Sequence, residues 1–167
     1  MSDTPRTDAY IEVKTIKAHD IESYLRCRVE CLRQHAPERF KDGEIRSTPQ
    51  FILKYGRKFN INPAVKWKGR MRKKGQCYMN AQQTMMTPPV LNAFDERLIY
   101  CEGYAISSFI GLPFEHGWCC TQGGDVIDPT WNDGVKYFGI PFKSEFAVTR
   151  MLKTEVYGIL GCEYMHE

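Results

Sequence analysis

The sequence predicts a single α+β domain in which helices pack against an antiparallel β-sheet. The 167 residues match the size of one ordinary domain, and a hydrophobic content of 43% is sufficient for a packed core. Apolar residues recur at helical spacing near the N-terminus, whereas residues 98–131 contain short runs rich in strand-forming residues. We therefore expect one domain over residues 1–167, with a flexible polar segment at residues 1–9.

The N-terminal half is predicted to contain one strand followed by helices. Residues 10–16 alternate like a strand, and Asp20 is placed to cap a helix that runs from Ile21 to about Gln34. Residues 50–59 form either a second short helix or an irregular basic segment. Residues 77–86 are predicted to be a helix that ends at Thr87-Pro88-Pro89, because consecutive prolines cannot continue a helix.

The C-terminal half is predicted to supply most of the sheet. Residues 98–107, 115–120 and 125–131 are rich in Ile, Tyr, Trp, Val and Thr and are separated by glycine-containing turns, which is typical of antiparallel neighbours. A helix is then expected to begin at Ser144 and to run to about Lys153. A last strand over residues 156–160 is expected to close the sheet.

The chain has the features of a cytoplasmic protein with reduced thiols. No apolar run approaches the roughly 20 residues that cross a membrane, and the N-terminus lacks the features of a signal peptide. The seven cysteines show no Cys-x-x-Cys spacing, which argues against a disulfide scaffold. Cys27 and His35 flank Cys31 in the first helix but lie about 12 Å apart along its axis, too far for one zinc ion. We expect no metal site.

A basic block interrupts an otherwise acidic chain. Between Ile45 and Phe94 there are ten Lys and Arg residues and no Asp or Glu, whereas the remainder holds 13 basic and 20 acidic residues. This asymmetry creates a positive potential that attracts an anionic partner or substrate. Residues 54–59 and 66–70 also interleave cations with aromatic side chains, as nucleic-acid-binding surfaces often do. A solvated basic face is the simpler alternative.

Cys77 is the first candidate for chemistry. It lies at the predicted start of a helix, where exposed backbone N–H groups carry a partial positive charge that favours the thiolate. Arg72, Lys73 and Lys74 lie immediately upstream and would act in the same direction if they are nearby. The alternative is that Cys77 is a buried, small apolar residue, as most free cysteines are.

His116 and Asp128 lie on the two sides of a Gly-Gly turn, and the register of this hairpin decides whether they meet. With a three-residue loop over residues 121–123, His116 directly opposes Asp128 and the two side chains share a face. With Gly123-Gly124 as a two-residue loop, Cys119 opposes Asp128 instead, and His116 points to the other face. His116 would then be an ordinary strand residue, and Asp128 would only bind backbone N–H groups of the following turn.

Four short motifs occur in order along the chain: Gly75-x-Cys77-x-x-x-Ala81, Glu102-Gly103-Tyr104-Ala105, His116-x-Trp118 and Val126-Ile127-Asp128-Pro129-Thr130-Trp131. Together they resemble the core motifs of the transglutaminase-like branch of the papain-like cysteine enzymes, over a catalytic core of about residues 75–131. The resemblance implies a papain-like fold, in which a helix that carries the nucleophile packs on an antiparallel sheet. It also implies a catalytic triad with Cys77 as nucleophile, His116 as general base and Asp128 as orienting residue.

The resemblance implies cysteine-dependent acyl transfer without a metal or an organic cofactor. We expect hydrolysis of an amide, peptide or isopeptide bond in a protein or peptide-like substrate, through an acyl-thioester on Cys77, as in a thiol protease. A transglutaminase or acyltransferase with an amine acceptor is the alternative. The backbone N–H of Cys77 is the natural first oxyanion donor, and Gln76 is a candidate for the second. Trp118 either shields the imidazole from water or belongs to the core.

The basic block supports a second class of function. Six cations upstream of Cys77 are candidates for binding an anionic substrate or partner: Lys66, Lys68, Arg70, Arg72, Lys73 and Lys74. The rival to an enzyme is a non-catalytic binding protein that uses the basic face at residues 54–74 to hold nucleic acid or an acidic partner. No membrane partner is expected.

Overall fold

The structure is a computed structural model that describes residues 20–40, 44–91, 94 and 96–160. Within this part of the chain, the fold is mixed α+β, with an antiparallel five-stranded sheet in the order β1-β5-β2-β3-β4. The general α+β prediction is therefore confirmed. The strand predicted at residues 10–16 and the flexible segment at residues 1–9 lie outside the described residues.

Most helices precede the four strands β2 to β5 along the chain, and one helix follows them. The α-helices are α1 (Ile21–His35), α2 (Thr48–Tyr55), α3 (Cys77–Met86) and α4 (Ser144–Thr154), with 3-10 turns η1 (Pro37–Phe40) and η2 (Pro89–Leu91). The strands are β1 (Arg57–Lys58), β2 (Ile99–Ser107), β3 (Pro113–Cys120), β4 (Val126–Ile127) and β5 (Gly134–Phe142). None of the described helices is long and apolar enough to cross a membrane.

Local signals account for the ends of the helices. The Asp20 side chain caps α1 by accepting a hydrogen bond from the backbone N–H of Ser23, which confirms the predicted helix start. The Ser47 side chain caps α2 in the same way. The segment at residues 50–59 therefore contains a helix that ends at Tyr55 and a short strand, which decides between the two predicted alternatives.

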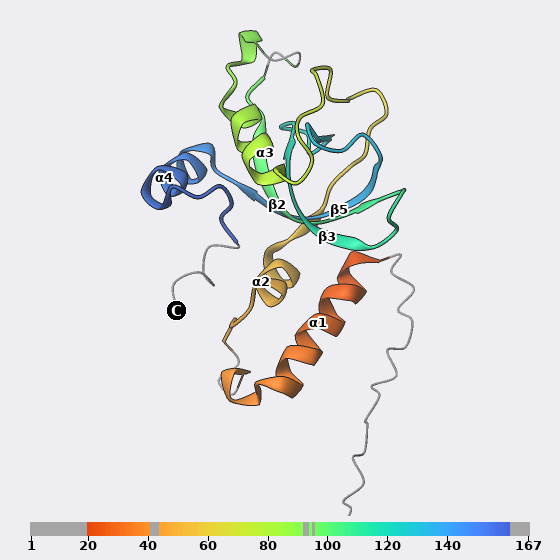
Figure 1. Cartoon of the computed structure of the whole chain (residues 1–167), viewed down its shortest axis with the longest axis vertical. Coiled ribbons are helices and arrows are strands. Elements are labelled where there is room, and N and C mark those ends of the chain that lie inside the picture. The colour runs from red at the N-terminus through yellow and green to blue at the C-terminus, as the bar shows by residue number, and fades with distance from the viewer. Residues whose placement is uncertain (1–19, 41–43, 92–93, 95, 161–167) are drawn as a thin grey trace, which may run out of the picture.

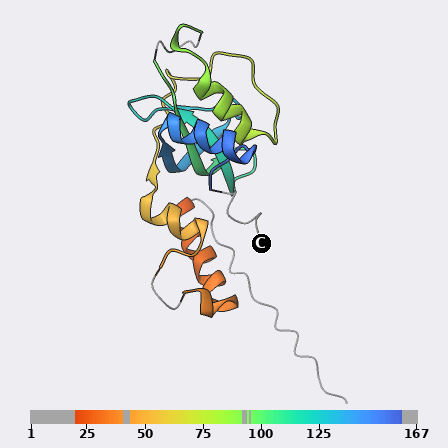
Figure 2. The same cartoon turned by 90° about the vertical axis from the view of Figure 1, so that its left-hand side faces the viewer.

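The two faces of the sheet carry different structures. On one face, α3 and α4 cover Tyr100 of β2 and Leu98 just before it, while α1 and α2 cover Tyr104 and Ile106 toward the other end of β2. Figures 1 and 2 show α3 and α4 together beside the sheet and α1 and α2 beyond one edge of it. The opposite face holds a separate, largely aromatic cluster around Trp118. The sheet curls around this aromatic cluster, which is where the candidate site lies.

Two glycines allow the sheet to curl. Gly103 of β2 and Gly139 of β5 are paired directly across the sheet. A Cβ atom on Gly103 would lie 2.3 Å from the Phe138 carbonyl oxygen, and one on Gly139 would lie 2.7 Å from the Trp118 ring. Both contacts are shorter than atoms can approach, so side chains larger than hydrogen would force the strands apart. The central strands therefore require glycine at both positions.

The structure corrects the sequence prediction of the sheet in three places. β5 was not predicted, because Gly134, Gly139 and Pro141 are unfavourable in a strand; Pro141 is tolerated because it lies beyond the end of the neighbouring strand β1. The strand predicted over residues 125–131 is only two residues long, since a turn begins at Asp128. The strand predicted over residues 156–160 does not form.

The residues at the end of the described chain are held by a side chain instead of a strand. Glu102, on β2, is 1% exposed and accepts hydrogen bonds from the backbone N–H groups of Ile159 and Leu160 and from the hydroxyl of Tyr100. These bonds replace the ladder that a terminal strand would make. Burial raises the pKa of the Glu102 carboxyl above its ordinary value, although the three hydrogen bonds act in the opposite direction.

Candidate active site

Cys77 is the first residue of α3, as the sequence predicts. Gly75, just before it, has a φ of +79°, which turns the chain into the helix. Gln76 occupies the N-cap position, but its side chain makes no capping hydrogen bond. The N–H groups of the first turn are therefore left without a side-chain cap, and the half-buried Cys77 thiol lies among them.

Gly117 brings the start of α3 against strand β3. A Cβ atom on Gly117 would lie 2.9 Å from the Tyr78 ring and 3.1 Å from the Tyr78 Cα atom, so only glycine permits this approach. β4 pairs with β3 only at Cys119 and Cys120, which leaves the edge of β3 open beside His116 and Gly117 among the described residues. At this open edge the Cys77 thiol lies near the imidazole of His116 and the N–H of Gly117, close enough that both lower the pKa of the thiol.

His116 is held by Asp128 in a buried ion pair. The His116 Nε2 atom lies 2.7 Å from the Asp128 Oδ2 atom, and the two side chains are 1% and 4% exposed. The other ring nitrogen, Nδ1, is buried and makes no hydrogen bond within the part of the chain that the structure describes. Because Nε2 is occupied, Nδ1 is the nitrogen that remains for the Cys77 thiol.

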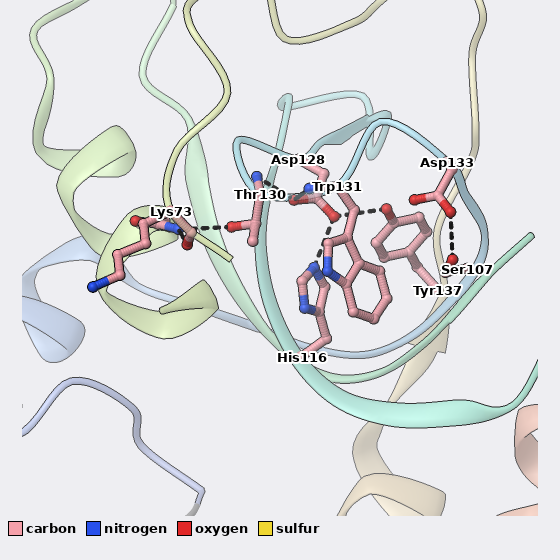
Figure 3. Close-up of polar contacts among 9 residues, drawn as sticks. Lys73, Ser107, His116, Asp128, Thr130, Trp131, Asp133 and Tyr137 are labelled. Carbon is pink, nitrogen blue, oxygen red and sulfur yellow. Dashed lines mark hydrogen bonds and ion pairs between the residues drawn. The ribbon is translucent and has the colours of Figure 1, made fainter. Parts of the chain in front are cut away.

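The two oxygen atoms of Asp128 have separate partners. Oδ1 accepts hydrogen bonds from the backbone N–H groups of Thr130 and Trp131, at 2.8 and 2.9 Å. Oδ2 accepts one from the Tyr137 hydroxyl at 2.7 Å, in addition to its contact with His116 (Figure 3). Both interpretations of Asp128 from the sequence are thus realised, since one oxygen binds the turn and the other binds the histidine.

Neither predicted hairpin register is present. Cys120 pairs with Val126 and Cys119 with Ile127, so the loop is Gln122-Gly123-Gly124, one residue later than the predicted three-residue loop. Gly124 takes the left-handed conformation, with a φ of +87°. This register extends to place Trp118 opposite Asp128, and because His116 shares a strand face with Trp118, its side chain still meets Asp128 diagonally.

Burial and hydrogen bonding shift the pKa values of Cys77 and His116 in opposite directions. Burial raises the pKa of the Cys77 thiol, but the His116 imidazole and the N–H groups of Gly117 and Tyr78 lower it, and the net pKa is below that of an ordinary thiol. Burial disfavours a charged His116, yet Asp128 and Cys77 raise its pKa to about 9. Both directions favour a thiolate–imidazolium pair over a neutral thiol and imidazole.

Aromatic side chains enclose the imidazole. The ring of Trp131 stacks on His116 with a centroid distance of 3.9 Å, whereas Trp118 is completely buried and its ring centroid lies 6.3 Å away. Trp131 is therefore the ring in direct contact with His116, whereas Trp118 belongs to the buried core, which is one of the two alternatives given for it. Tyr137 lies on the unpredicted strand β5, so no sequence pattern near the motifs indicated its contact with Asp128.

The basic block does not form one continuous face. Figure 1 shows α2 beyond one edge of the sheet and the loop at residues 60–76 on the opposite side of the molecule. Lys58 forms an ion pair with Glu22 at 2.7 Å, and Arg57 lies over the ring of Phe59. The predicted face at residues 54–74 is thus divided, and only the part at residues 66–74 adjoins α3.

The other cysteines that the structure describes belong to no cluster able to hold a metal ion. Six cysteines within the described residues are free thiols, and Cys101 and Cys120 approach within 3.5 Å in the core. Cys27, Cys31 and His35 lie along α1, where the His35 Nδ1 atom contacts the Cys31 carbonyl oxygen at 2.7 Å. The described part of the chain contains no cluster of three His, Cys, Asp or Glu side chains able to hold a metal ion.

Comparisons with protein-family models, with curated proteins and with solved structures find no match to the chain. The geometry of the site is therefore the basis for assigning a function.

Proposed function

We propose that the protein is a cysteine-dependent acyl-transfer enzyme that hydrolyses an amide bond. The observation that carries the proposal is the placement of Cys77 at the uncapped start of α3, beside an imidazole whose other nitrogen is held by Asp128. A nucleophile, a proton carrier and an orienting carboxylate in this order are the groups that thiol-mediated acyl transfer requires. The papain-like and transglutaminase-like resemblance agrees with this chemistry and is itself part of the proposal.

Acylation begins from the thiolate–imidazolium pair. The Cys77 sulfur attacks the carbonyl carbon of the amide and forms a C–S bond, while negative charge develops on the carbonyl oxygen. The backbone N–H of Cys77 and the side-chain amide of Gln76 are the proposed donors to that oxygen. His116 then gives its proton to the amine nitrogen as the C–N bond breaks, which leaves a neutral imidazole and a thioester.

Deacylation reverses the proton transfer. The neutral His116 imidazole removes a proton from a water molecule as the water oxygen attacks the thioester carbon. The C–S bond breaks, the carboxylic acid departs, and the thiolate–imidazolium pair is restored. Asp128 holds the ring in position through both steps and stabilises its charged form, and Trp131 limits the access of water to the imidazole.

The proposal predicts that Cys77 reacts as a thiolate at a pH below that of an ordinary thiol. The rate of Cys77 alkylation by iodoacetamide, followed by peptide mass spectrometry against pH, should have its midpoint below the usual value of about 8.5. In His116→Ala and in the bulkier His116→Gln, the Cys77 thiol remains buried but the imidazole that lowers its pKa is lost. The midpoint of alkylation should therefore move above the usual thiol value. At pH 7 we expect each variant to react at least about tenfold more slowly.

Two controls distinguish a change in the pKa of Cys77 from unfolding of the variant and from the pH dependence of the reagent itself. The exposed Cys31 in the same molecule is an internal reference, and the circular dichroism of each variant should match that of the wild type. Incubation with p-nitrophenyl acetate should acetylate Cys77, and release of acetate, as opposed to transfer to an added amine, distinguishes hydrolysis from transfer. A midpoint that does not change in either folded variant would contradict the proposal.

A further inference from the structure

The loop that leads into α3 carries positive charges that are not neutralised. Lys66, Lys68, Arg70, Lys73 and Lys74 are exposed. None of these side chains forms an ion pair with another described residue. The segment between Ile45 and Phe94 contains no carboxylate at all. The positive potential of this loop is therefore available to a molecule that binds from solution.

The loop is fixed to the candidate site by hydrogen bonds from its backbone. The Arg72 N–H donates to the carbonyl oxygen of Pro129 at 2.8 Å, next to Asp128. The buried amide of Asn80 donates to the Lys73 carbonyl oxygen at 2.8 Å and to the Thr130 hydroxyl at 3.0 Å. Figure 3 shows Lys73 and Thr130 beside the His116–Asp128 pair, with the Lys73 side chain extending away from it. The cations are thus held on an ordered loop.

The loop and α3 enclose an open depression whose lining includes Gln76, the residue before Cys77. It has a volume of about 690 Å³ and is lined on the loop side by Arg70 and Lys73 and on the helix side by Gln76 and Met79. Gln76 immediately precedes Cys77. Arg72 is the exception among the cations, because its guanidinium is half-buried and donates to the Gln83 side chain at 2.8 Å. Arg70 and Lys73 are therefore the side chains placed to meet a ligand.

We propose that this depression is a subsite for carboxylate side chains of a polypeptide substrate, next to the amide that Cys77 attacks. The inference rests on the proposed function and names its substrate class. Because Gln76 lines the depression and precedes Cys77, a molecule that presents its carbonyl carbon to the thiol can place an anionic group here. Peptides that carry Asp or Glu meet both requirements, whereas the backbone of a nucleic acid offers phosphates but no acyl carbon.

Two pairs of probes test the subsite. Iodoacetate carries a carboxylate and iodoacetamide does not, so the ratio of their rates at Cys77 reports the local potential. A peptidyl vinyl sulfone with two Glu residues, compared with the same peptide containing two Gln residues, reports recognition of carboxylates.

The double variant Arg70→Gln/Lys73→Gln removes two positive charges and leaves the side-chain hydrogen bonds of the loop intact. Arg33→Gln/Arg39→Gln removes the same charge near the far end of α1 and in η1 (Figure 1).

We expect the loop variant to lower the iodoacetate ratio about fourfold at low salt, the effect of two unit charges about 10 Å from a reacting group in water. The ratio for the doubly charged peptide should fall further, and the control variant should leave both ratios unchanged. The pH midpoint with iodoacetamide should remain below that of an ordinary thiol in both. Ratios that the loop variant does not change would overturn the subsite and leave the proposed function intact. If a short single-stranded RNA protects Cys77 better than a Glu-rich peptide does, the loop binds nucleic acid and the proposal is wrong. A Cys77 that is inert to iodoacetamide would overturn both proposals.

Discussion

At the scale of single residues, Asp128 combines a structural and a chemical role in one carboxylate. Four donors surround it: two backbone N–H groups, a phenol and the imidazole. These hydrogen bonds offset the cost of burying the carboxylate. The same carboxylate contributes to the raised pKa of His116. The ion pair at Cys77 thus depends on a turn that is recognisable in the sequence as Asp128-Pro129-Thr130.

Tyr137→Phe should weaken the fold more than the reactivity. The substitution removes one donor to a buried carboxylate and should lower the free energy of unfolding by about 1.5–3 kcal/mol, measured by urea denaturation. The Asp128 Oδ2 atom still accepts from His116, so the pH midpoint of Cys77 alkylation should stay below that of an ordinary thiol. Asp128→Asn removes the negative charge beside His116, so in this variant the midpoint of Cys77 alkylation should rise. A midpoint that rises equally in both variants would contradict this division of roles.

The three residues proposed as a triad could be selected from the sequence, but two of their partners could not. Cys77, His116 and Asp128 stand in short motifs at recognisable helix and strand boundaries. Trp131 was visible within such a motif, yet its stacking on His116 depends on how the turn after Asp128 folds back. Tyr137 reaches Asp128 from another strand. Contacts of this kind depend on tertiary structure and have no local sequence signal.

At the scale of elements, the approach of α3 to β3 determines whether the thiol and the imidazole meet. Gly117→Ala places a methyl group 2.9 Å from the Tyr78 ring and 3.1 Å from its Cα atom, so the helix must shift away from the strand. We expect a loss of about 1–3 kcal/mol in the free energy of unfolding and a rise in the pH midpoint of Cys77 alkylation, because the imidazole and the Gly117 N–H move away.

A glycine elsewhere supplies the control for this variant. Gly123 lies in the hairpin loop, where the nearest atom to an added Cβ is 3.6 Å away. Gly123→Ala should therefore leave both the stability and the pH midpoint unchanged. If Gly117→Ala lowers stability but does not move the midpoint, then the close packing of α3 on β3 serves the fold alone.

The helices were predicted better than the sheet, for physical reasons. α1 and α3 have local start and stop signals, so Asp20 and the Pro88-Pro89 pair defined their ends. The order and register of strands depend on distant partners, and β5 is stabilised by pairing with β1 and β2 in spite of its glycines and proline. The loop register was wrong by one residue because both Gly123 and Gly124 could adopt the left-handed conformation.

At the scale of the whole molecule, Glu102 connects the sheet with residues 159 and 160. Because its folded-state pKa is raised above the ordinary value, protonation favours the folded state. The stability that this group contributes is therefore fully present below its unfolded pKa, near about 4.3, and declines as the pH rises through the folded pKa.

Glu102→Gln should remove this pH dependence. An amide supplies only one acceptor oxygen and presents N–H groups to the backbone donors of Ile159 or Leu160. We expect a loss of about 1–3 kcal/mol in the free energy of unfolding at pH 4.5, and a smaller difference from the wild type at pH 7.5. Urea denaturation across this range measures it, with the exposed Glu145→Gln as control. A difference that grows as the pH rises would contradict the direction of the raised Glu102 pKa.

The buried amide of Asn80 has one more consequence. It bridges the loop that carries Arg70 and Lys73 to the turn that holds Asp128. By thermodynamic reciprocity, a ligand that binds more tightly when this bridge is made also stabilises the bridged arrangement by the same free energy. Under the proposed function, the binding of an acidic substrate and the formation of the thiolate–imidazolium pair are then linked equilibria, and a substrate without acidic groups should react more slowly with Cys77 once it is bound.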